Sequence, residues 1–321
     1  MSFFKPRKVE KNYDLLSSCS WYTPDVGGLF AVLGWFLVGL IIAGIVTAPL
    51  MFGSIPLYYV MLIMYPLQFV AVFIFVRIRS SRNMAFDTGY ALDSNHFGKW
   101  GGALLAVAVG VGTYAAGMML EVVNQYLPDT EGSLMETMAK MMEGPLWVNI
   151  VTMAIMAPLC EEWLCRGVIL RGLLNYEHKS PETDEVRSRG MSPALAIVIS
   201  AIFFAAIHGN IWQGVTAFAI GCLFGYVYYR TGSLKLTILM HCVNNTVAVL
   251  MGKFAPESLK DAKSILEIVP VWEYVIIFVV SAAFLWFLID YLRKIETQDP
   301  QGNCDIIPSS EDLISNGESV Q

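Results

Sequence analysis

Two adjacent carboxylates and an arginine lie inside a stretch of hydrocarbon side chains. The stretch reads WVNIVTMAIMAPLCEEWLCRGVILRGLL and contains Glu161, Glu162 and Arg166. An ionisable side chain at the centre of a membrane helix costs about 2.5–3.5 kcal/mol on insertion scales, so it usually faces a cavity or a partner. Glu162 and Arg166 are four residues apart with the acid first, an order that favours a helical ion pair. Glu161 points about 100° away around the helix and needs a partner from elsewhere.

Two histidines lie in later apolar segments. His208 ends the run AIVISAIFFAAIH, and His241 lies in LTILMHCVNNTVAV, where Asn245 follows four residues later on the same helical face. An imidazole N–H and a carboxamide N–H that point to one place suit a developing oxyanion. Glu161 and His208 could hold an attacking water and take its proton. These residue types indicate water-mediated acyl cleavage without a covalent intermediate. The alternative is a transporter or scaffold whose buried polar groups only lock helices together.

The composition is that of a membrane protein. Of the 321 residues, 55% are hydrophobic and 15% are charged, and the mean hydropathy is +0.55, whereas about a quarter of the residues in an average soluble domain are charged. Hydropathy predicts an all-α polytopic protein with eight membrane helices, at 27–50, 55–76, 100–122, 145–174, 193–209, 211–230, 234–252 and 269–292. We therefore expect one membrane domain, residues 27–294, between an N-terminal cytosolic segment, 1–26, and a disordered acidic tail, 295–321.

The basic residues predict the orientation of these helices. Sixteen of the 21 Lys and Arg residues fall on one side of the predicted membrane, so the positive-inside rule places both termini in the cytosol, as an even number of spans requires. The net charge of −6 argues against nucleic acid as a partner. The expected partners are membrane lipid and a peptide or membrane-anchored protein substrate. The oligomeric state is not readable from the sequence.

Three short motifs occur in order on three of the predicted helices. EEWLCR, residues 161–166, fits EExxxR; FAAIH, residues 204–208, fits FxxxH; and HCVNN, residues 241–245, fits HxxxN. Together they resemble the CPBP family, also called the Abi or CAAX protease family, of intramembrane endopeptidases, which is related to the type II CAAX prenyl endopeptidases. The resemblance covers roughly residues 145–252 and implies a catalytic core on predicted helices four, five and seven.

The resemblance also implies a role for each motif residue. Glu161 and His208 would activate water, and His241 and Asn245 would form the oxyanion hole. A second group would support them: Glu162, Arg166 and Phe204. The alternative within the same fold is a non-catalytic member that acts as a transporter, a regulatory protein or an immunity-type scaffold.

Metal dependence is left open by the residues. Proteins of this kind are commonly labelled metalloproteases, and Glu161, His208 and His241 could supply a His₂Glu set of the kind that catalytic zinc uses. The sequence contains no HExxH motif, and asparagine is not among the usual zinc ligands. We expect no metal cofactor, with zinc as the alternative. The substrate, including whether it is prenylated, is not readable from the sequence.

Overall fold

The computed structural model describes residues 22–53, 55–82, 92–127, 140–179, 186–256 and 264–295. Over these ranges it confirms the predicted all-α polytopic fold, with one short hairpin as the exception. Seven runs of helix among the described residues are long and apolar enough to cross a membrane. The predicted N-terminal segment and acidic tail fall almost entirely outside the described residues.

All eight hydropathy peaks are helical. They correspond to α1 (Val26–Phe52), α2 (Leu57–Arg82), α3 (Gly101–Leu120), a fourth span over Leu146–Asn175, α8 (Pro193–Ala206), α9 (Ile211–Thr231), α10 (Leu234–Phe254) and α12 (Val271–Lys294). The exception in length is α8, which has 14 residues and is therefore about 21 Å long. A hydrocarbon layer is roughly 30 Å thick, so α8 is too short to cross it alone.

The fourth span is continuous but changes its helix type along its length. It consists of α5 (Leu146–Asn149), the π-helical η3 (Ile150–Met156), α6 (Ala157–Glu162), the π-helical η4 (Trp163–Leu170) and α7 (Arg171–Asn175). It is also the most buried of the seven candidate spans. Within its apolar stretch of 18 residues, 56% lies buried inside the protein, against 17–33% in the other spans. Because π-helical turns are rare and occur frequently at functional sites, this span is a candidate for carrying functional residues.

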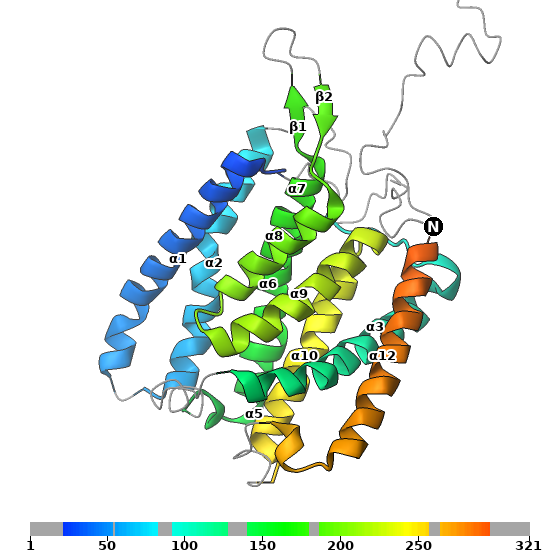
Figure 1. Cartoon of the computed structure of the whole chain (residues 1–321). Helices are drawn as coiled ribbons and strands as arrows, with labels where there is room; N and C mark the ends of the chain where they lie inside the picture. Colours follow the sequence, from blue (N-terminus) through cyan, green and yellow to red (C-terminus); the bar gives the residue numbers. More distant parts are fainter. Residues whose placement is uncertain are drawn as a thin grey trace, which may run out of the picture.

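The helices are arranged around this buried span. In Figure 1, α1 and α2 lie side by side at one edge of the bundle, α12 lies at the opposite edge, and α6, α8, α9 and α10 fill the middle. Segments of the fourth span contact α2, α8, α9 and α10. Residues of the fourth span therefore meet side chains from segments that are distant in the sequence.

The short elements lie in the connections between the helices. They are η1 (Gly98–Trp100), η2 (Glu121–Tyr126), η5 (Ile265–Glu267) and an antiparallel hairpin of β1 (Glu177–Lys179) and β2 (Val186–Arg189). The hairpin projects from one end of the bundle (Figure 1). The sequence predicted only a polar loop here, because the two strands are three and four residues long and carry no clear alternation of polar and apolar residues.

A buried arginine fixes α9 against α12. The guanidinium of Arg230 is fully buried and donates hydrogen bonds to the backbone carbonyls of Leu292, Arg293 and Ile295. The last carbonyls of a helix have no partner within the helix, so Arg230 satisfies those at the end of α12. A buried cation in this chain therefore links two helices through backbone carbonyls.

Candidate active site

Glu162 and Arg166 form the ion pair that their spacing predicts. Arg166 Nη1 lies 2.8 Å from Glu162 Oε1, and both side chains are fully buried. The second terminal nitrogen, Nη2, donates to the carbonyl of Gly221 in α9 at 2.8 Å, and the guanidinium carbon lies 4.5 Å from the ring centroid of Phe204 in α8. The pair therefore links the fourth span to two neighbouring helices while each charge offsets the other.

The same carboxylate orients His241 on α10. Nδ1 of His241 lies 3.0 Å from Glu162 Oε1, and the imidazole is buried. An ionised carboxylate can only accept, so we assign the ring hydrogen to Nδ1, which leaves Nε2 directed away from Glu162. In the neutral ring Nε2 can accept a hydrogen bond but cannot donate one. His241 can therefore donate to an oxyanion only as the imidazolium.

His208 lies in the turn after α8 and not within the helix. α8 ends at Ala206, Gly209 adopts φ +67°, which permits the reversal, and Asn210 caps the start of α9. Nδ1 of His208 lies 2.8 Å from the carbonyl oxygen of Phe204. Because a carbonyl only accepts, Nδ1 carries the hydrogen and Nε2 of the neutral ring is an acceptor. The turn thus presents a hydrogen-bond acceptor that is only half-buried.

Phe204 is the contact that the two histidines share. Its ring meets those of His208 and His241 edge to face, with a centroid separation of 5.2 Å in each case. The ring is 3% exposed, so it cannot turn away to solvent. The structure therefore brings the histidines of two separate motifs to the same neighbourhood, beside the Glu162–Arg166 pair.

Asn245 connects α10 to the π-helical part of the fourth span. Its side-chain Nδ2 donates to the backbone carbonyl of Met153 at 2.8 Å, and its Oδ1 accepts from Asn244. In a π-helical turn the carbonyl of Met153 would bond the N–H of residue 158, which is a proline and has none. Asn245 supplies the missing donor. Its second Nδ2 hydrogen is left for another acceptor.

Glu161 lies in an environment different from that of Glu162. The side chain is 5% exposed, and its Oε1 accepts a hydrogen bond from the hydroxyl of Tyr65 in α2. The other oxygen, Oε2, is buried and has no hydrogen-bond partner among the described residues. We expected a histidine to partner Glu161, whereas the structure provides a phenol that lies 96 residues earlier in the chain.

The residues of the alternative metal site do not form a ligand group. In the described part of the chain, no three His, Cys, Asp or Glu side chains gather closely enough to hold a metal ion. Nδ1 of His208 and Nδ1 of His241 each contact a protein oxygen, so Nε2 is the remaining ring nitrogen of both histidines. Among the described residues, Glu161, His208 and His241 are therefore not gathered as a ready-made set of three metal ligands.

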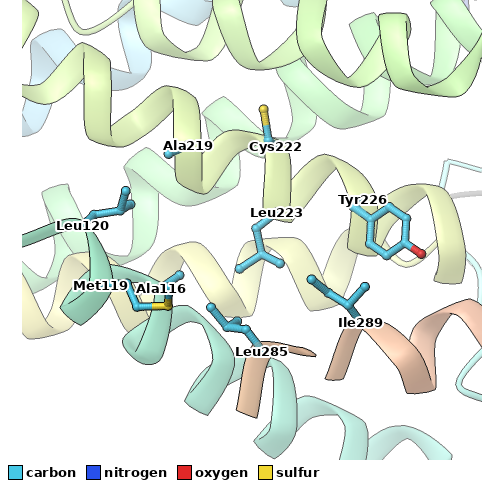
Figure 2. Close-up of a pocket in the computed structure, with 9 residues that line it drawn as sticks. All are labelled: Ala116, Met119, Leu120, Ala219, Cys222, Leu223, Tyr226, Leu285 and Ile289. Carbon is cyan, nitrogen blue, oxygen red and sulfur yellow. The ribbon is translucent and has the colours of Figure 1, made fainter. Parts of the chain in front are cut away.

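A separate apolar pocket lies on another face of α9. It has a volume of about 530 Å³ and is lined by Ala116, Met119, Leu120, Ala219, Cys222, Leu223, Tyr226, Leu285 and Ile289. Figure 2 shows these side chains reaching it from α3, α9 and α12. Its lining contains none of the motif residues, so it is not the polar cavity that the sequence predicts around Glu161.

Comparison with known families agrees with the motifs. Residues 143–247 match the family described as type II CAAX prenyl endopeptidase Rce1-like, and this segment includes every predicted catalytic and supporting residue. No curated protein and no solved structure gives a match. The family supports protease activity, and the seven apolar helices make the chain an integral, multi-pass membrane protein. The family match confirms, over residues 143–247, the resemblance carried by the three motifs.

Proposed function

We propose that the chain is an intramembrane endopeptidase that hydrolyses a peptide bond with water activated by Glu161. One observation carries the proposal: two adjacent buried carboxylates have different partners. Oε1 of Glu162 contacts the cation Arg166 and the ring of His241, whereas Oε1 of Glu161 contacts only the neutral hydroxyl of Tyr65 among the described residues. Oε2 of each acid has no hydrogen-bond partner among those residues. Paired acids in different environments take different roles in catalysis. Glu162 is thus the supporting carboxylate and Glu161 the reactive one.

The first step is attack by water. As the water oxygen forms its bond to the scissile carbonyl carbon, one water proton passes to Oε2 of Glu161. His208 holds the second water hydrogen through Nε2, the acceptor that remains because Nδ1 is bonded to the carbonyl of Phe204. The carbonyl oxygen becomes the oxyanion of a tetrahedral intermediate.

The second step is collapse of that intermediate. The oxyanion accepts hydrogen bonds from the second Nδ2 hydrogen of Asn245 and from Nε2 of His241 in its imidazolium form. The C–N bond then breaks, and the protonated Glu161 returns its proton to the leaving amine. The enzyme ends in its starting state, with a new carboxylic acid and a new amine as products, and the acid then loses its proton to solvent.

The short length of α8 supports access of water to the site. α8 falls about 9 Å short of a 30 Å hydrocarbon layer, so the turn that bears His208 is expected inside the layer. Non-helical backbone at that depth is tolerated where it is buried in protein or lines a water-filled cavity. We therefore expect the turn that bears His208 to line a water-filled cavity within the membrane.

The proposal also includes the expected organisation of the chain. Residues 27–294 form the membrane domain, residues 145–252 its catalytic core, and both termini lie in the cytosol. The substrate is a peptide or a membrane-anchored protein, and the mechanism needs no metal. The description of the matching family makes a prenylated peptide the first substrate to test.

The test compares the wild-type chain with Glu161→Gln in lipid nanodiscs. The probes are a farnesylated peptide that ends in a CAAX sequence and the same peptide without the lipid, and the products are identified by mass spectrometry. We expect hydrolysis by the wild type and a loss of about 10²- to 10⁴-fold in kcat in the variant, with binding of the peptide retained. Glu143→Gln, at an exposed position outside the site, is the matched control.

Two results would contradict the proposal. Hydrolysis by Glu161→Gln at the wild-type rate would remove Glu161 from the chemistry. Binding of both probes by a folded wild-type chain that cleaves neither would favour the non-catalytic member of this fold.

A further inference from the structure

We infer that Tyr65 is a positioning residue for catalysis, and that its hydroxyl holds Glu161 so that Oε2 faces the attacking water. The inference rests on the proposed function, in which Glu161 is the base. Tyr65 lies in α2, outside the matching segment 143–247 and outside all three motifs. Neither the motifs nor the family match therefore assigns it a role.

The contact itself is unusual for an apolar helix pair. The Tyr65 hydroxyl donates to Oε1 of Glu161, and no other described residue bonds either oxygen of that carboxylate in the structure. A buried tyrosine hydroxyl normally finds a partner, but a backbone carbonyl would have sufficed. Here the hydroxyl is bonded to Glu161, whereas Glu162, the other member of the acidic pair, contacts a cation.

A neutral donor suits a general base better than a cation would. Arg166 pairs with Glu162 and so commits that carboxylate to an ion pair. A phenol instead restrains Glu161 and satisfies one of its oxygens, while the carboxylate remains available to take a proton. Because Oε1 is bonded to Tyr65, Oε2 is the oxygen that accepts the proton of the attacking water. The difference between the two acids therefore depends on a residue that is contributed by α2.

The packing around Tyr65 restricts its ring. The ring lies 5.8 Å from that of Phe69, Phe69 lies 5.4 Å from Phe36 in α1, and Phe36 lies 6.2 Å from Phe203 in α8. α2 also contacts α6, the segment that ends with the acidic pair. This run of aromatic contacts fixes the Tyr65 ring between the α1–α2 pair and the catalytic helices, as a residue that positions another must be fixed.

The test is Tyr65→Phe, which removes the hydroxyl and keeps the ring that contacts Phe69. The full-length chain in nanodiscs is assayed with the farnesylated CAAX peptide. We expect kcat to fall about 10- to 100-fold, the range for loss of a hydrogen bond to a charged group, with KM within about twofold of wild type. The matched control is Tyr59→Phe, which removes a hydroxyl from a more exposed tyrosine, 38% accessible, on the same helix and should leave both constants unchanged.

Three outcomes distinguish a failure of the inference about Tyr65 from a failure of the proposed function. If Tyr65→Phe has wild-type kcat while Glu161→Gln is inactive, Tyr65 has no positioning role and the proposed function stands. If Tyr65→Phe raises KM with kcat unchanged, Tyr65 contacts substrate and the inference is also wrong. If Glu161→Gln is fully active, the proposed function is wrong, and the inference about Tyr65 that rests on it is wrong as well.

A loss of folding cannot be mistaken for a loss of positioning. The fraction of each preparation that is competent is counted by titration with an uncleavable analogue of the farnesylated peptide, and kcat is expressed per competent molecule. A lower yield of folded Tyr65→Phe with unchanged kcat per competent molecule would show a merely structural tyrosine and would overturn the inference.

Discussion

Replacement of Arg166 by methionine is predicted to destabilise the fold by about 3–5 kcal/mol, the range for breaking a buried ion pair from one side. Arg166 and Glu162 are both 0% exposed and lie 2.8 Å apart. Without the guanidinium, Glu162 would be a buried carboxylate whose remaining contact is His241. The carbonyl of Gly221 would also lose the donor that Arg166 supplies at 2.8 Å.

The same structure predicts that a second substitution restores part of the loss. In Glu162→Gln/Arg166→Met the uncompensated charge is gone, because both partners are replaced by neutral groups. We expect the double variant to be at least about 2 kcal/mol more stable than Arg166→Met alone, since the penalty for the unpaired charge is the larger part of the loss. Arg77→Met, at an exposed position near the end of α2, is the control and should change stability by less than about 0.5 kcal/mol.

Reversible unfolding in mixed micelles, followed by circular dichroism, gives the free energies of the four proteins. A stability of Arg166→Met equal to that of the wild type would refute the reasoning, because it would mean that Glu162 is not a buried charge that depends on Arg166. A double variant no more stable than Arg166→Met would refute it as well, because the loss would then come from packing alone.

Two further predictions concern the chemistry. Asn245→Ala should lower kcat by about 10²- to 10³-fold, because it removes a proposed oxyanion donor, with little change in KM; a normal kcat in steady-state assays would remove Asn245 from the oxyanion hole. Exhaustive chelation, verified by elemental analysis, should leave the activity unchanged, because Glu161, His208 and His241 do not form a metal-ligand group; an activity that is lost on chelation and restored by zinc would contradict the metal-free mechanism.

Features that depend on local spacing could be predicted from the sequence. The Glu162–Arg166 pair follows from a separation of four residues, and it forms at 2.8 Å although Arg166 lies in a π-helical segment. The membrane helices follow from runs of apolar residues, because the layer thickness sets the length that a span needs. Both signals are contained in a single stretch of chain.

Features that depend on contacts between distant helices could not be predicted. Tyr65 resembles any other aromatic residue of an apolar helix until α2 is placed against α6. The bond of Asn245 to Met153 depends on a π-helical turn that ends near Pro158, and hydropathy does not distinguish π from α. The tautomer of His241, which restricts how it can stabilise an oxyanion, follows only from the contact with Glu162.

The central claim is spatial and can be measured directly. An experimental structure of Glu161→Gln with an uncleaved peptide would give the distances from the side chain at 161 and from Nε2 of His241 and Nδ2 of Asn245 to the scissile carbonyl. We predict a water within about 3 Å of both the residue-161 side chain and the carbonyl carbon, with the two donors about 3 Å from the carbonyl oxygen. A peptide bound with its scissile bond beyond reach of residue 161, or with His241 and Asn245 turned from the carbonyl oxygen, would contradict the proposed site.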